Sequence, residues 1–227
     1  VKNYLEPTSL GAVLTLTTDS PYLIVRQGSM NVPSLGTLDT INNQSTPFRV
    51  SVLQNVPQSY KARLKLTLKD GSWSDSQFIT FLINPTLVTQ NVNDIQLTLA
   101  NNGRLAYLDY PDNQYGVGFV FNGVNHLYEG GLILGTSESR VVNVVRNQLT
   151  QDEDFRSGDF FTLQTPGIVS DQDGFTRFSD STAPTANRIG VRVALHSYAY
   201  SNPVDSKYII LSYEITNTTT APLTNFL

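Results

Sequence analysis

Apolar and polar residues alternate along much of the chain. Between residues 62 and 69, alanine and leucine alternate with arginine, lysine and threonine. Successive side chains of an extended chain point to opposite faces, so this period of two predicts a β-strand with one face in the core and one in water. The same pattern predicts further strands at 48–52, 95–99, 189–200 and 207–216.

Turn-forming residues separate these runs. The sequences 69–72 and 101–103 combine glycine with aspartate or asparagine directly after a predicted strand, which is typical of hairpins. Residues 171–174, Asp-Gln-Asp-Gly, predict another turn, before a strand at 175–178. One stretch, 137–147, has a serine that suits a helix cap, but its β-branched valines favour a strand over a short helix.

Many short strands with polar turns indicate an all-β fold built from antiparallel β-sandwiches. The sequence 84–86, Asn-Pro-Thr, is the best candidate for a domain boundary, because proline cannot donate a hydrogen bond to a strand ladder. We therefore expect two sandwiches in tandem. The first is an Ig-like or fibronectin-type-III-like sandwich over 1–86, and the second is a larger, jelly-roll-like antiparallel sandwich over 87–227.

Composition and charge exclude several classes of function. The 227 residues are 40% hydrophobic and include no cysteine, so a core is available, whereas disulfides, thiol nucleophiles and thiolate metal sites are not. The net charge of −4 and the dispersed basic residues argue against a nucleic-acid partner. No apolar run approaches the ~20 residues that a membrane span needs. Since the chain starts without Met and without an apolar leader, we interpret it as a piece of a longer protein.

Three sequences in the middle of the chain carry a family resemblance. They are 93–105 (NDIQLTLANNGRL), 109–119 (DYP, then GVGF) and 127–135 (LYEGGLILG). In this order they resemble the region that follows the protease domain in large secreted subtilisin-like peptidases, mainly from Bacteroidetes-type bacteria. The preceding residues, with cues at 46–50 and 66–71, resemble the Ig-like or fibronectin-type-III-like module next to that region.

The resemblance implies a non-catalytic accessory region of a larger exported subtilisin-like serine protease. Its location would then be outside the bacterial cell or at the cell surface, and its first partner would be the protease domain of the same parent chain. Stability, domain spacing and positioning of a protein substrate are the roles that follow. The alternative is an adhesion or carbohydrate-binding module, with a protein or a glycan as its ligand.

The sequence offers no convincing catalytic site. Gly135-Thr136-Ser137 matches the three residues around the subtilisin nucleophile, but such a serine needs a histidine base and an orienting carboxylate. His126 and His196 both lie outside the family's histidine motif, and Glu138 begins a sequence unlike the one that follows the family's serine. We therefore interpret Ser137 as a polar turn residue and expect the chain itself to lack enzyme activity. His196 shares a strand face with Arg192 and is expected to be solvated.

Two groups of residues are candidates for binding. Asp171 and Asp173 precede Gly174, and loops of this kind supply some of the about six to eight oxygens that calcium takes. An ordinary Asp-Gly turn is the alternative, and no other cofactor is expected. Tyrosines in an Asn- and Gly-rich stretch offer ring area for sugars or peptides, unless they fill the core and rim of the sandwich. These candidates are Tyr107, Tyr110, Tyr115 and Tyr128.

Overall fold

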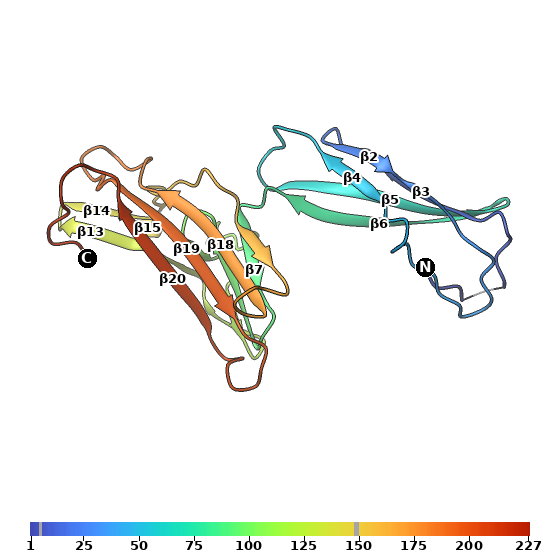
Figure 1. The fold of residues 1–227 in the computed structure, drawn as a ribbon. Helices are drawn as coiled ribbons and strands as arrows, with labels where there is room; N and C mark the ends of the chain where they lie inside the picture. The colour runs from blue at the N-terminus through green and yellow to red at the C-terminus, as the bar shows by residue number, and fades with distance from the viewer. Residues whose placement is uncertain (5, 148–149) are drawn as a thin grey trace. The chain divides into compact units, whose positions relative to one another are not determined.

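The computed structural model describes residues 1–4, 6–147 and 150–227, and all of them lie in strands, turns or loops (Figure 1). Strands make up 48% of the chain, and the described ranges contain no helix. Accordingly, no helix long and apolar enough to cross a membrane is present in these ranges. The sheets are antiparallel throughout, which confirms the predicted all-β class.

The chain divides into two compact units, Val1–Asn84 and Pro85–Leu227. The division falls within the sequence 84–86. Asn84 takes a positive φ of 53°, which a strand residue does not adopt, and Pro85 has no N–H to donate. The backbone therefore leaves the last strand of the smaller unit at this point.

The smaller unit contains a four-stranded sheet in the order β3-β1-β5-β6 and a separate two-stranded sheet, β2-β4. The hairpin predicted at 69–72 is confirmed, since β5 and β6 pair over eleven residues and Gly71 joins them with a φ of 60°. The strands are β1 (Val13–Thr18), β2 (Leu23–Gln27), β3 (Ser29–Asn31), β4 (Arg49–Val52), β5 (Tyr60–Asp70) and β6 (Trp73–Ile83).

Strand β5 shows how alternation builds this unit. Ala62 and Leu64 are buried and pack with Leu16 of β1 and Leu23 of β2, so the two sheets share an apolar layer. The residues between them on β5 are exposed, as the sequence predicts. These wet-face residues are Lys61, Arg63, Lys65 and Lys69, with the half-buried Thr67 among them.

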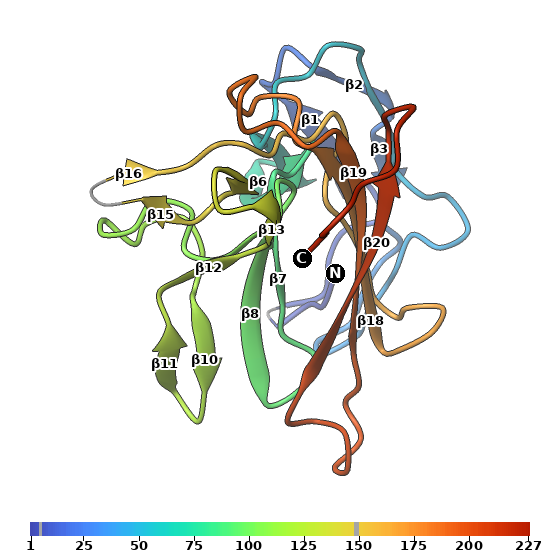
Figure 2. The same cartoon turned by 90° about the vertical axis from the view of Figure 1, so that its left-hand side faces the viewer.

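The larger unit contains two main sheets and two small hairpins (Figure 2). One sheet has the order β11-β10-β8-β9-β12, with β7 also paired to β8, and the other has the order β17-β18-β19-β20. The hairpins are β13-β14 and β15-β16. The strands are β7 (Leu87–Gln90), β8 (Ile95–Ala100), β9 (Arg104–Ala106), β10 (Phe119–Phe121), β11 (Val124–Leu127), β12 (Glu129–Gly131), β13 (Ile133–Ser137), β14 (Arg140–Asn143), β15 (Arg146–Asn147), β16 (Thr150–Gln151), β17 (Thr162–Gln164), β18 (Gln172–Ser179), β19 (Val191–Ala199) and β20 (Ile209–Asn217).

The core of the larger unit lies between the two main sheets. Leu97 and Leu99 of β8 belong to the same buried cluster as Val193 and Leu195 of β19. The two β19 side chains are completely buried. The alternating residues read at 95–99 and 189–200 are therefore confirmed as strands that turn their apolar faces toward one core.

The turn predicted at 171–174 is wrong, because Asp173 and Gly174 lie within strand β18. Gly174 is buried and pairs with Ser197 of β19. A Cβ atom at this position would collide with Ser197 Oγ and would lie 3.0 Å from the Phe161 ring. Glycine is needed here for close packing inside the sheet, and local sequence does not distinguish that need from a turn.

We predict that Gly174→Ala destabilises the larger unit by about 1–3 kcal/mol, because overpacking forces its neighbours to move. Ser197 Oγ is buried without a hydrogen-bond partner among the described residues. The double variant Gly174→Ala, Ser197→Ala should therefore recover part of this loss. Free energies of unfolding from urea denaturation measure both effects. Equal stability of Gly174→Ala and the parent chain would contradict the packing explanation.

Candidate functional site

Three of the four predicted binding tyrosines gather in one place. The rings of Tyr107 and Tyr128 lie 6.2 Å apart between centroids with an interplanar angle of 25°, and the ring of Tyr110 lies 6.1 Å from that of Tyr128. Tyr110 is 38% exposed and Tyr128 is 52% exposed. The three residues, here called the tyrosine cluster, therefore present aromatic rings to solvent.

Pairing between β9 and β12 sets up this cluster. Tyr107 follows the last residue of β9, and Tyr128 precedes the first residue of β12. The amide nitrogen of Tyr107 donates to the carbonyl oxygen of Tyr128 over 3.1 Å, which continues the ladder by one step. Residues paired across neighbouring strands have side chains close together, so this pairing brings the two rings into contact.

Arg146 of β15 joins the cluster from a distant part of the chain. Its guanidinium carbon lies 4.9 Å from the centroid of the Tyr110 ring, and its Nη2 donates to the Tyr110 carbonyl oxygen over 2.5 Å. Its Nε also pairs with Oε2 of Glu129 at 3.1 Å. A guanidinium over a tyrosine face is attracted by the ring, so Arg146 holds Tyr110 and β12 together.

Glu129 adds an acceptor to the same place. Its side chain is 13% exposed, and its Oε1 atom is buried without a hydrogen-bond partner in the described part of the chain. Glu129 and Arg146 were not predicted as site residues from the sequence. In the sequence, Glu129 is a single charge before two glycines and Arg146 is a single charge after two valines. Neither position shows that the two residues, 17 apart in the chain, form an ion pair.

Arg104 lies beneath this region and is 5% exposed. Its guanidinium donates to the carbonyl oxygens of Val144, Leu108 and Asp152 over distances of 2.9, 3.1 and 3.0 Å. Burial lowers the pKa of Arg104 below its usual value, and the negative charge of Glu153 offsets only part of that effect. Because each of the three carbonyls belongs to a different segment, Arg104 fixes the loop after β9 against the segment that carries Arg146.

Tyr115 is placed apart from the tyrosine cluster. It is 62% exposed, and no ring contact joins it to another aromatic residue within the described ranges. Its backbone is nevertheless well anchored, since the amides of Gln114 and Tyr115 donate to the two carboxylate oxygens of Asp109. Tyr115 thus belongs to the same ordered loop without sharing the stacked rings.

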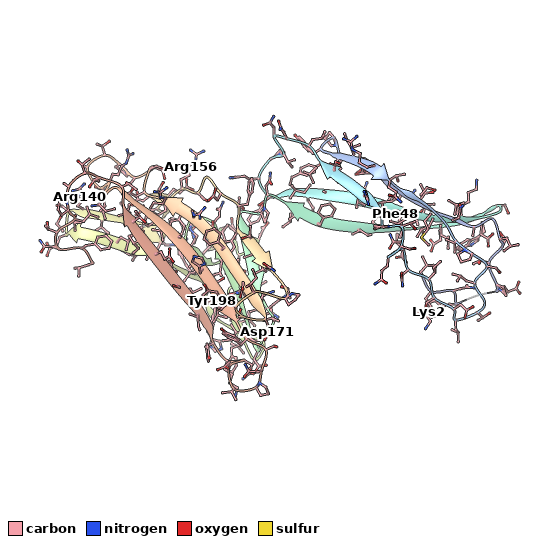
Figure 3. The ribbon with its side chains drawn as sticks, in the orientation of Figure 1. Lys2, Phe48, Arg140, Arg156, Asp171 and Tyr198 are labelled. Carbon is pink, nitrogen blue, oxygen red and sulfur yellow. The ribbon has the colours of Figure 1, made fainter. Side chains whose placement is uncertain are left out.

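A second aromatic surface lies on the outer face of β18 and β19 (Figure 3 labels Tyr198). His196 lies 4.7 Å from the Phe175 ring and 6.3 Å from the Tyr198 ring, and Arg177 sits over Phe175. A hollow of about 370 Å³ on this face is lined by Phe175, Arg177, Arg192 and His196 among others. The predicted shared face of His196 and Arg192 is confirmed, but its contacts with aromatic rings were not foreseen.

The residues that suggested a serine protease do not meet. Ser137 is exposed at the β13–β14 hairpin, where its Oγ lies 3.3 Å from Ser139 Oγ. His126 is exposed and contacts the Phe119 ring. In the described part of the chain, neither His126 nor His196 forms a hydrogen bond with a hydroxyl or a carboxylate. A nucleophile activated by histidine would require that bond.

The two predicted calcium ligands serve different loops. Asp173 accepts hydrogen bonds from the amides of Ile168, Val169 and Ser170 at 2.6–2.9 Å. Asp171, labelled in Figure 3, accepts from the amide and hydroxyl of Ser201. Outside the masked positions, no group of three His, Asp or Glu side chains is arranged to hold a metal ion.

Calcium binding at Asp171 and Asp173 stays a prediction. If both carboxylates take the ion, the melting temperature should rise steadily with calcium concentration, because a ligand that binds only the folded state stabilises it. A melting temperature that does not change between chelator and millimolar calcium would contradict the prediction.

The hydrogen bonds to Asp173 also predict how the stability of the fold changes in acid. Burial would raise its pKa, but the hydrogen bonds from Ser170, Val169 and Ile168 outweigh burial and lower the pKa below its usual range. Because the pKa is lowered, ionised Asp173 stabilises the fold. This stabilisation is complete above the unfolded-state pKa of about 3.9 and is lost as the pH falls through the folded-state pKa.

We therefore expect Asp173→Asn to cost about 1–3 kcal/mol near neutral pH and to flatten the loss of stability below about pH 4. Unfolding free energies measured from pH 2.5 to 7 test both parts. Asp112→Asn, a change at an exposed carboxylate, is the matched control and should preserve the acid dependence. An unchanged pH profile in Asp173→Asn would contradict the assignment.

Comparisons of the chain with protein-family models, with curated proteins and with solved structures find no match. The function of the chain must therefore be inferred from its own residues.

Proposed function

We propose that this chain is a non-catalytic accessory region of a larger exported bacterial subtilisin-like serine protease, which positions protein substrate beside the protease domain. The proposal is supported by the resemblance at 93–135. The same residues contribute Tyr107, Tyr110 and Tyr128, so the stretch with the strongest resemblance also builds the exposed aromatic surface.

The tyrosine cluster with Arg146 is the observation that carries the proposal. Tyrosine and arginine, together with tryptophan, are enriched among the few central interface residues that contribute most of the binding energy. The rings of Tyr107, Tyr110 and Tyr128 already contact one another, and Arg146 already lies over Tyr110. These side chains lose little conformational freedom on binding, which favours contact with a protein.

The finer architecture belongs to the same proposal. We infer an Ig-like or fibronectin-type-III-like sandwich for the smaller unit, supported by the apolar layer shared between its two sheets. A jelly-roll-like sandwich for the larger unit is supported by the buried cluster between its two main sheets. Sandwich modules of this kind suit spacing and stabilisation of a neighbouring domain, the other roles that the resemblance implies.

The proposal predicts a selective defect in the parent protease. In the full-length protein, Tyr110→Ala combined with Tyr128→Ala should raise KM for casein at least about thirtyfold, because two interface residues at about 1 kcal/mol or more each would be lost. Hydrolysis of a short chromogenic peptide, which is too small to reach the tyrosine cluster, should not change. Tyr4→Ala, at a residue that is 68% exposed in the smaller unit, is the matched control.

Three results would contradict this role. The first is a reading frame without a subtilisin-type domain beside the chain. The second is an equal loss of casein hydrolysis in Tyr4→Ala. The third is an equal loss of activity on casein and on the short peptide, which would assign the region to protease stability instead of substrate positioning.

The alternative, an adhesion or carbohydrate-binding module, is favoured by one observation. The rings of Tyr107 and Tyr128 are only 25° from parallel, and Tyr128 is half exposed, so they offer a flat surface for a sugar ring. A glycan array with the chain and with Tyr128→Ala tests this function. Binding that is lost in the variant would support it, and silence across the array would contradict it.

A further inference from the structure

The smaller unit carries an unprotected edge strand. β6 is the last strand of its sheet and pairs with β5 over eleven residues, and no described strand pairs with its other edge (Figure 1). Soluble proteins usually protect such edges with lysine, proline or a β-bulge. Between Trp73 and Ile83 there is no proline or basic residue, Asp75 is the only charge, and the register with β5 has no irregularity.

Both faces of β6 leave apolar side chains in water, Phe78 and Leu82 on one and Ile79 and Phe81 on the other, and the second face continues the core of the unit. Ile79 and Phe81 pair with Leu64 and Ala62 of β5, so they lie on the face that forms the core of the unit. Ile79 is nevertheless 48% exposed and Phe81 is 37% exposed. The apolar layer therefore continues to the edge of the sheet, where one more strand would cover it.

The edge strand of the larger unit differs from β6 in how its apolar face is packed. Its edge strand β20 also lacks lysine and proline, but Ile209, Leu211 and Tyr213 on one of its faces pack against the buried core. Ile209, Leu211 and Tyr213 of β20 are therefore supported by their own unit, whereas Ile79 and Phe81 of β6 are about half and one third exposed.

The opposite face of the β5–β6 hairpin is basic. It carries the wet-face residues of β5, which include three of the five lysines of the chain. Arg63 pairs with Asp19 at 2.6 Å, whereas the three lysines form no ion pair within the described residues. Two of the lysines pair with exposed apolar residues of β6, Lys61 with Leu82 and Lys65 with Phe78, whereas Lys69 pairs with Ser74. The apolar stems of Lys61 and Lys65 can lie along these two side chains, so that their ammonium groups extend toward the free edge of β6.

Both faces of β6 restrict what could bind there. A strand added to β6 would place alternate side chains on opposite faces, about 6.6–6.8 Å apart on each face. One set would meet the apolar residues Ile79 and Phe81. The other set would lie beside Phe78 and Leu82 and about 9.6 Å from β5, two strand spacings away, where the ammonium group of a lysine and a carboxylate side chain can meet. We infer that β6 binds, by strand addition, an extended segment of another protein in which acidic residues alternate with apolar residues.

A second copy of this chain fits the edge less well. If β6 paired with β6 of a second copy, the basic wet-face residues of both β5 strands would lie on the same joined sheet with no acidic residues between them. Like charges at an interface oppose association. Since β6 lies in the smaller unit and the tyrosine cluster lies in the larger one, this inference does not rest on the proposed function.

Synthetic peptides test the inference with the 227-residue chain. The probe has eleven residues, to match β6, with glutamate and valine in alternation. One control peptide has the same composition with its glutamates in a single block, and another replaces glutamate by lysine. At about 50 mM salt, the alternating acidic peptide should bind at least about tenfold more tightly than either control in fluorescence anisotropy. Binding should also slow amide hydrogen exchange in 73–83.

Variants separate the two faces. Lys61→Glu combined with Lys65→Glu should weaken binding of the acidic peptide at least about tenfold and should strengthen binding of the lysine peptide, because the charges on an exposed face are reversed. Ile79→Lys should block strand addition while leaving the basic row intact, since a charge pointing inward protects an edge. Lys207→Glu, at an exposed lysine of the larger unit, is the matched control and should not change binding. Circular dichroism and melting temperature show whether each variant folds.

Four outcomes would overturn the inference. They are equal binding of the alternating and block peptides, binding without slower exchange in 73–83, and no binding of the alternating peptide up to about 1 mM. The fourth is a concentration-dependent dimer of the chain that Ile79→Lys abolishes, which would identify a second copy as the occupant.

Discussion

The buried guanidinium of Arg104 is the interaction on which the candidate site depends. Burying a charge is costly unless its donors are satisfied, and Arg104 satisfies them with three backbone carbonyls instead of a carboxylate. The carbonyls of Leu108, Val144 and Asp152 must therefore occupy fixed positions around one side chain. Because Tyr110 and Arg146 follow closely after two of these residues, the tyrosine cluster is positioned by a group that itself never reaches the surface.

Polar side chains do the same for other loops of the larger unit. Asp173 accepts amide hydrogen bonds from the loop before it, and Asp180 accepts them from Ile189, Gly190 and Val191. Backbone N–H groups without strand partners need such acceptors when they are buried. Both aspartates therefore hold the backbone of a loop in place. This explains why acidic residues occur near turns in the sequence without forming a shared site for a metal ion.

The strands could be predicted from sequence where one face is buried, because alternation is then a local property. This holds for β5, where Ala62 and Leu64 face the core, and for β19. The tyrosine stretch was also found locally, from residue type and spacing. Arg146 and Glu129 were not, since their contact with the rings depends on pairing between distant segments. Gly174 was misread because its role is set by a residue of the next strand.

The same alternation that folds the smaller unit also determines what its surface can bind. On β5, placing leucine and alanine in the core requires the intervening residues to face water, and these happen to carry one sign of charge. On β6, Ile79 and Phe81 continue the apolar face of β5, while Phe78 and Leu82 lie on the other face, and no further described strand covers any of them. Where apolar core residues continue to the edge of a sheet, exposed apolar area and unpaired backbone groups occur together. The addition of one strand buries the apolar area and pairs the backbone groups. The basic row on the other face then selects which strand is added.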